Sequence, residues 1–173
     1  MERSEINIYE CKWKHCAVLA EIGATTFYDT FRPFNTEEDM QSYLKSNYTQ
    51  EKIKSNLSTS GIHYLLGYLA NEDQGYVKLI ENPTGLNLEG KVMELEKIYL
   101  RPSAQGSGLA KQLIELAFKK SRNLGFDTLY LGVWQENDRA LSFYKKMGFE
   151  IFDTRKFQLG SRLCEDYLLY IRL

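Results

Sequence analysis

Gln105-Gly106-Ser107-Gly108-Leu109-Ala110 is the stretch of sequence that decides the fold of this chain. It follows an apolar run that ends at Leu100, and it opens a segment with helical periodicity. A loop in that position meets a helix N-terminus, where backbone N–H groups lack partners and carry partial positive charge. Gly106 and Gly108 have no Cβ, so a ligand can approach the backbone closely. The stretch therefore predicts a loop that binds phosphate groups, although a tight turn without a ligand would use the same glycines.

Two nucleotide-binding motifs with glycine-rich loops do not fit this stretch. The Walker motif fails on spacing and on its hydroxyl residue, although Lys111 follows Ala110. The dinucleotide-binding motif needs Gly or Ala at the position that Lys111 occupies. Its acidic residue, about 20 positions further on, would be Asp127, which precedes its strand rather than ending it. We therefore expect the loop to hold another phosphate-bearing ligand.

Helices and strands are predicted on both sides of the loop. Before it, the hydrophobic pattern predicts helices over 13–28, 36–46 and 49–57 and strands over 6–9, 62–69, 75–80 and 92–100, with a turn at 71–73. After it, the pattern predicts helices over 108–123 and 138–147, a strand over 128–134 and a hairpin from 149–157 and 164–173. No repeat, linker or low-complexity tract interrupts this order, so residues 4–173 are expected to form a single α+β domain.

Composition and charge restrict the classes of function. The 173 residues are 43% hydrophobic and 26% charged, which is typical of a soluble globular domain, and the net charge of −1 would not attract nucleic acid. Early charges such as Glu2 and Arg3, and the lack of an apolar run near ~20 residues, predict neither a signal peptide nor a membrane span. Cys11, Cys16 and Cys164 have no metal-ligand spacing. We expect reduced thiols, no metal and a cytoplasmic location.

Two segments resemble the GNAT family of acetyltransferases. Residues 98–102, 105–110 and 112–114 are similar to its central motif, whose signature is Gln/Arg-x-x-Gly-x-Gly/Ala. Residues 137–149 are similar to its Asn-x-x-Ala-x-x-Phe-Tyr-x-x-x-Gly-Phe element, one helix and one strand later. The order of elements agrees with the family over nearly the whole chain. The resemblance implies the GNAT fold, a mixed central sheet of about seven strands with helices on both faces.

The resemblance also implies acetyl-CoA as the cosubstrate and assigns residues to it. Asn137 would bind the CoA arm by a hydrogen bond, and Tyr144 would lie beside the thioester sulfur. The pantetheine slot would open where two parallel strands splay apart, near Leu100 and Val133. The pyrophosphate would be held by the loop and the helix start, Gln105, Gly106, Ser107, Gly108, Leu109, Ala110 and Lys111. The pantetheine arm would pair with a strand end, as an added β-strand would, at Ile98, Tyr99 and Leu100.

Acetyl transfer to an amine needs an uncharged nucleophile and a proton for the leaving thiolate. An alkyl amine with a pKa near ~10.4 is mostly protonated at neutral pH, so a carboxylate is expected as base, directly or through water. Glu96 is the candidate, because the same position in polyamine acetyltransferases of this fold resembles a base. Glu96 is two positions from Ile98, so the two should face one side of the sheet. An ion pair with a surface lysine is the alternative, and Glu94 is the second candidate.

Tyr144 is the candidate acid. A phenol with a pKa near ~10 can donate to a thiolate whose conjugate acid has a pKa near ~8.5, although an aromatic packing role would also explain this residue. Neither motif contains a cysteine, so direct transfer in a ternary complex is favoured over an acetyl-cysteine intermediate.

The acceptor is less well defined by the sequence. Short strings at 27–31, 75–78 and 131–134 look like those of bacterial PaiA-type spermidine/spermine N-acetyltransferases, which implies a polyamine acceptor held by carboxylates and aromatic faces. Tyr28, Asp29 and Glu94 are the candidate substrate contacts. The acids 37–39 follow Thr36 and are typical of a helix start.

Several alternatives stay open for the acceptor and the assembly. A protein N-terminus, a lysine side chain or another small amine would also fit, as would a regulator that binds CoA without catalysis. The family often dimerises through its C-terminal strands, and residues 149–173 are apolar enough for a homodimer, but an ordinary hairpin would look the same.

Overall fold

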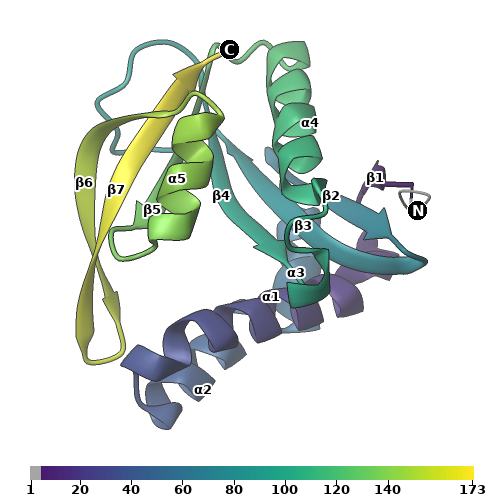
Figure 1. Ribbon diagram of the computed structural model, residues 1–173, viewed down its shortest axis with the longest axis vertical. Coiled ribbons are helices and arrows are strands. Elements are labelled where there is room, and N and C mark those ends of the chain that lie inside the picture. The colour runs from purple at the N-terminus through teal and green to yellow at the C-terminus, as the bar shows by residue number, and fades with distance from the viewer. Residues whose placement is uncertain (1–4) are drawn as a thin grey trace.

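One mixed sheet contains all the strands that the structure describes. They are β1 (Asn7–Glu10), β2 (Ile62–Leu69), β3 (Glu72–Glu81), β4 (Val92–Leu100), β5 (Thr128–Trp134), β6 (Glu150–Leu159) and β7 (Arg162–Arg172). The seven strands lie in the order β1-β2-β3-β4-β5-β7-β6 (Figure 1). Neighbours run antiparallel except β4 and β5, which are parallel. The computed structural model describes residues 5–173, so Glu2, Arg3 and the domain boundary expected at residue 4 lie outside the described residues.

Helices cover both faces of this sheet. They are α1 (Cys16–Phe31), α2 (Glu37–Asn47), α3 (Gln50–Leu57), α4 (Leu109–Asn123) and α5 (Asp138–Lys146), with 3₁₀ turns at Trp13–His15, Arg32–Phe34 and Pro102–Ala104. Figure 1 shows α1 and α2 on one side of the sheet and α4 and α5 on the other. The predicted α+β GNAT fold, with its mixed seven-stranded sheet between helices, is confirmed.

Alternation along the strands separates two cores. Leu19 and Ile22 of α1 pack with Tyr64 and Tyr76 on what we call the α1 face of the sheet. On the opposite face, which we call the α4 face, the buried side chains come from α4, α5 and the alternate strand positions, among them Leu65, Val77, Leu79, Leu109, Leu113 and Tyr144. Each fully buried Leu or Val side chain contributes about 1.5–3 kcal/mol. Helix α4, which follows the predicted phosphate-binding loop 105–110 (called the phosphate loop below), and α5, which contains Tyr144, are therefore held on the same face.

Two threonines cap helices, and two left-handed residues form the turn between β2 and β3. The hydroxyls of Thr36 and Thr49 accept hydrogen bonds from the backbone N–H groups of Asp39 and Lys52, so these threonines cap α2 and α3. The turn between β2 and β3 lies at Ala70 and Asn71, both left-handed with φ of 52° and 65°, rather than at 71–73 as the sequence predicted. Two left-handed residues match the twist of a hairpin, so Glu72 already pairs in the sheet.

Three further properties concern residues 5–173 only. Within this range the structure contains no helix of the length and apolarity needed to cross a membrane. It also contains no group of three or more His, Cys, Asp or Glu side chains placed to hold a metal ion. Cys11, Cys16 and Cys164 are free thiols, and the last two are buried.

Candidate active site

A slot opens between the two parallel strands. The ladder between β4 and β5 has its last pair at Glu94 and Tyr130. Beyond it, β4 pairs only with β3 as far as Leu100, and β5 pairs only with β7 as far as Trp134. The backbone edges that face the slot, 95–100 and 131–134, therefore have no strand partner among the described residues. An extended, amide-rich arm could pair with such an edge, as was expected for Ile98, Tyr99 and Leu100.

The phosphate loop at the mouth of this slot has free backbone donors. Gly106 and Gly108 are left-handed, with φ of 79° and 94°, and a Cβ at either would meet no atom within 4 Å. The two glycines therefore allow a left-handed backbone next to open space, and they are not needed to make room for a neighbouring atom. No hydrogen bond to a residue in 5–173 occupies the N–H groups of these two residues, of Ala110 or of Lys111. Four free N–H donors at a helix start suit an anion.

The other N–H groups of the loop donate hydrogen bonds within the loop region. Fewer N–H groups are therefore free to bind phosphate than the sequence predicted. Gln105 N–H donates to Pro102 and Ser107 N–H to Ala104, while Leu109 N–H donates to the hydroxyl of Ser107. That hydroxyl also donates to the carbonyl of Ala104 at 2.7 Å. Three of the seven expected donors, those of Gln105, Ser107 and Leu109, therefore shape the loop and are not free for a phosphate.

Two side chains missed by the sequence reasoning brace the loop. Arg139 of α5 donates from Nη1 to the side-chain oxygen of Gln105 at 2.6 Å, which places an exposed cation beside the free amides. Arg101, which begins the loop region, donates from Nε to the carbonyl oxygen of Asp73 at 2.9 Å. The signal for Arg139 was its place in the second motif, two residues after Asn137, whereas nothing local marked the partners of Arg101.

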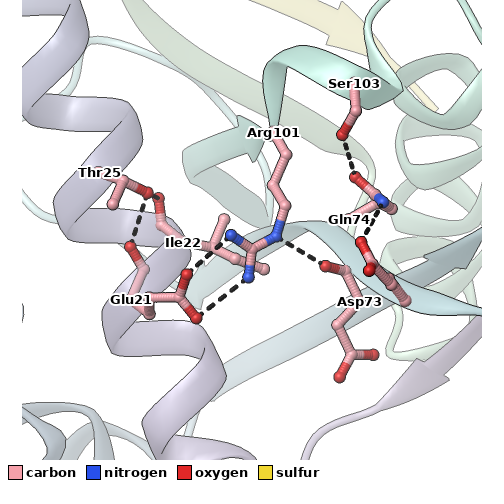
Figure 2. A network of polar contacts seen from close by, with 8 residues as sticks. Glu21, Ile22, Thr25, Asp73, Gln74, Arg101 and Ser103 are labelled. Carbon is pink, nitrogen blue, oxygen red and sulfur yellow. Dashed lines mark hydrogen bonds and ion pairs between the residues drawn. The ribbon is translucent and has the colours of Figure 1, made fainter.

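Figure 2 shows how Arg101 joins three elements. Its Nη1 and Nη2 contact both carboxylate oxygens of Glu21 on α1, at 2.8 and 3.1 Å. Next to it, Ser103 donates to the side-chain oxygen of Gln74 on β3 at 2.8 Å. The hydrogen bond from Arg101 lowers the pKa of Glu21, which keeps that carboxylate charged. The phosphate loop is therefore attached to β3 on one side and to α1 on the other.

Helix α5 brings Asn137 and Tyr144 to the α4 face. The side-chain oxygen of Asn137 accepts from Ala140 N–H at 3.1 Å and caps the helix, so its NH₂ group is the part left to reach a CoA arm. Tyr144 is 6% exposed and packs edge-on against Phe149. Burial raises the pKa of Tyr144, so the phenol stays protonated at neutral pH.

A β-bulge in β4 changes the placement of Glu96. Leu79 pairs with Leu95 and Lys78 with Lys97, so Glu96 is the extra residue. Ile98 packs against the core of the α4 face. Glu96 instead forms an ion pair of 2.5 Å with Lys78, whose neighbours Val77 and Leu79 point to the α4 face. The expectation that Glu96 and Ile98 share a face is wrong, because the bulge interrupts the alternation on which it rested.

Both candidate bases lie on the α1 face beside the slot. Glu94 accepts a hydrogen bond of 2.8 Å from Tyr130 at the last β4–β5 pair, and burial raises the pKa of this carboxyl. Glu96 remains partly exposed in its ion pair. The partner Lys78 is a nearly buried lysine, with 7% of its side chain exposed, rather than the surface lysine considered from the sequence.

Aromatic rings line the same face. Phe27 of α1 stacks on Tyr43 of α2 at 4.4 Å between centroids, and the hydroxyls of Tyr48 and Tyr99 lie 2.6 Å apart. Trp134, at the end of β5, packs with Phe31 of α1 at 5.6 Å. This aromatic set, Phe27, Phe31, Tyr43, Tyr48, Tyr99 and Trp134, joins α1 and α2 to both strands of the slot.

The other two predicted substrate residues lie at the margin of this set. Tyr28 packs against its core and donates to Glu37 at 2.6 Å. Asp29 is exposed, and no hydrogen bond or ion pair within residues 5–173 joins it to the aromatic set. Of the three predicted substrate residues, only Glu94 is brought to the slot itself.

Free amides at a helix start on one face, with carboxylates and aromatic rings on the other, suit an enzyme that transfers an acyl group from a CoA-type donor to an amine. The family model for the Acetyltransferase (GNAT) family matches residues 24–149. The chain belongs to this family and is an N-acetyltransferase, and the cosubstrate of the family is acetyl-CoA.

Relatives and solved structures agree with this assignment. The chain is 33% identical over 165 residues to an N-acetyltransferase in the pepI 3′ region of Lactobacillus delbrueckii subsp. lactis, covering 95% of each. It is 26% identical over 150 residues to the spermidine N(1)-acetyltransferase of Thermoplasma acidophilum, covering 86% of this chain and 91% of the relative. The crystal structure of the PaiA N-acetyltransferase of Thermoplasma acidophilum, in complex with coenzyme A, superposes with a TM-score of 0.80 at 24% identity, covering 98% and 99% of the two chains.

Proposed function

We propose that residues 4–173 form one catalytic domain that moves the acetyl group of acetyl-CoA to a primary amine by direct attack in a ternary complex, with a polyamine such as spermidine or spermine as the acceptor. The slot between β4 and β5 carries this proposal, because it joins the free amides of the phosphate loop on the α4 face to carboxylates and aromatic rings on the α1 face. The donor and the amine would thus approach each other from opposite faces of the sheet.

The loop and the strand edge would position the donor. The N–H groups of Gly106, Gly108, Ala110 and Lys111 would bind the pyrophosphate, with Arg139 as an adjacent cation. The unpaired edge of β4 over 98–100 would bind the amides of the arm, and the NH₂ group of Asn137 would donate to it.

The proton transfers would use groups from both faces. Glu96 or Glu94 would take the proton of the attacking amine, directly or through water, and the raised pKa of Glu94 makes it a stronger proton acceptor than an ordinary glutamate. Glu96 would first have to loosen its ion pair with Lys78. Tyr144, protonated at neutral pH, would donate to the leaving thiolate on the α4 face.

Polyamines fit the aromatic set because ammonium groups are attracted to ring faces and to carboxylates. The named spermidine N(1)-acetyltransferase among the relatives supports the same acceptor class. The site offers few unpaired acids, however, since Lys78 pairs with Glu96 and Arg155 with Asp166. We place the reaction in the cytoplasm, where the three free thiols would stay reduced.

Release of CoA thiol from acetyl-CoA tests the proposal. The purified protein is assayed with spermidine, spermine, a peptide with a free N-terminus, a peptide with an internal lysine, and no amine. We expect thiol release above the no-amine background with the polyamines and less with either peptide. Faster thiol release with a peptide than with the polyamines would contradict a polyamine acceptor. No release with any amine would contradict acetyl transfer to primary amines.

A further inference from the structure

Lys97 is an amine of the protein itself that lies beside the slot. It follows the bulge residue Glu96 on β4 and stands three positions beyond the last β4–β5 pair, Glu94 and Tyr130. Its Nζ lies 5.3 Å from the ring centroid of Tyr48 and 5.9 Å from that of Tyr99. The amine therefore points to the α1 face and into the aromatic set.

The surroundings of this amine are those that the acceptor amine requires. Within residues 5–173 Lys97 forms no ion pair, unlike Lys78 and Arg155 on the same face. Glu94 and Glu96 are the carboxylates that act on it electrostatically, and Lys78 is the cation that does. Burial, the largest effect, lowers the pKa of Lys97, which increases the fraction of uncharged, nucleophilic amine.

We propose that Lys97 is a self-acetylation site, at which the enzyme transfers the acetyl group of bound acetyl-CoA to its own Nζ. This inference rests on the proposed function, because it uses the same slot. Nζ attacks the thioester carbonyl, an amide C–N bond forms and the C–S bond breaks. The proton lost by the amine goes to Glu96 or Glu94 through water, and the thiolate takes a proton to leave as CoA thiol. No oxidant or further reactant is needed.

Acetylation would change the acceptor side of the site in two ways. The amide carries no charge, so the repulsion between Lys97 and a cationic acceptor would disappear. The added acetyl group would also occupy space between the slot and the rings of Tyr48 and Tyr99. The modified enzyme would therefore bind its acceptor differently from the unmodified enzyme.

Mass spectrometry of the intact protein tests this proposal. The protein is incubated with acetyl-CoA and no amine, and the acetylated residue is located by peptide mapping over a time course. Lys52 of α3, an exposed lysine, is the internal comparison for chemical acetylation. We expect Lys97 to be labelled at least about ten-fold faster than Lys52, because positioning next to a bound donor raises the effective concentration of the amine. Excess CoA should slow labelling at Lys97 only.

Two variants and the amine assay separate the outcomes. Lys97→Arg should abolish the site-specific label, whereas Lys52→Arg should leave the label on Lys97. Thiol release with an added amine, together with labelling of Lys97 no faster than Lys52, would overturn self-acetylation and leave the proposed function intact. Fast labelling of Lys97 without release by any added amine would support self-acetylation and overturn the proposed acceptor.

Discussion

Arg101 and Glu21 lie 80 positions apart and form a two-point ion pair that attaches the phosphate loop to α1. The loop is the expected donor site, and α1 contributes Phe27 and Phe31 to the aromatic set that is the proposed acceptor side. The Arg101–Glu21 ion pair thus connects the two proposed binding regions directly. A substitution of Arg101 or Glu21 should therefore weaken the binding of acetyl-CoA, although neither side chain is expected to contact acetyl-CoA.

Glu21→Gln should raise the KM for acetyl-CoA by about two- to five-fold with a smaller effect on kcat, because a half-exposed ion pair contributes no more than about 1 kcal/mol. The pKa of Glu21 is lowered in the folded state, so its contribution to stability is present above the ordinary carboxyl pKa and is lost as the pH falls through the lowered value. Arg122→Lys, at the far end of α4, is the matched control. Equal KM values for Glu21→Gln and wild type would contradict the connection.

Gly108→Ala should cost about 1–2 kcal/mol of stability, because alanine is strained at a φ of 94°. It should also raise the KM for acetyl-CoA, since the free N–H of Gly108 would shift. Gly85→Ala is the control, with a φ of 79° and nothing within 4 Å of its Cβ, in the loop between β3 and β4. Thermal unfolding and steady-state kinetics of both variants separate strain from binding. An equal change of the KM for acetyl-CoA in Gly108→Ala and Gly85→Ala would contradict a role of the loop in binding the donor.

Tyr144→Phe should lower kcat by about a hundred-fold or more, since general acid catalysis contributes about 10²–10⁴-fold, with little change in the Kd for CoA. The pKa of Tyr144 is raised, so the wild-type rate should show no loss of this acid near neutral pH. Tyr170→Phe on β7 removes a hydroxyl outside the slot and serves as control. Wild-type turnover in Tyr144→Phe would assign Tyr144 to packing alone.

The two candidate bases differ in the pH profile that they predict. A base must be deprotonated, so kcat/KM should fall as the pH drops through its pKa. If Glu94 is the base, this fall should occur above the ordinary value of about 4.3, because burial raises the pKa of Glu94. Glu94→Gln should then remove most activity while Glu96→Gln keeps more. The reverse order would identify Glu96, and full activity in both variants would exclude a carboxylate base from β4.

Much of the fold followed from local patterns in the sequence. Helices such as α4 carry apolar residues at helical spacing and end near Gly125, so periodicity and caps locate them. The turn at Ala70 and Asn71 was misplaced because Glu72 and Asp73 are polar, yet they pair at the end of the sheet. The two motifs predicted the loop at 105–110, the separation of two parallel strands near Leu100 and Val133, and the helix that contains Tyr144.

The rest of the site depended on information that no local pattern carries. The bulge at Glu96 shows only in the pairing of β4 with β3, so period-two reasoning wrongly placed Glu96 on the same face of the sheet as Ile98. The partner of Arg101 is distant in sequence, and the sharing of amides within 105–111 depends on exact turn geometry. Lys97 was not predicted, because the rings of Tyr48 and Tyr99 that distinguish it come together only in the folded structure.

The position of β7 has a consequence for how the enzyme is made. β7 lies between β5 and β6, although it follows both in the chain. A ribosome therefore releases β5 before it has made β7, the strand that pairs with β5 over all of residues 128–134. Until residues 162–172 emerge, β5 has an unpaired edge and the wall of the slot that it forms is not fixed. The nascent chain should gain the capacity to bind its donor late, after the phosphate loop itself has long been synthesised.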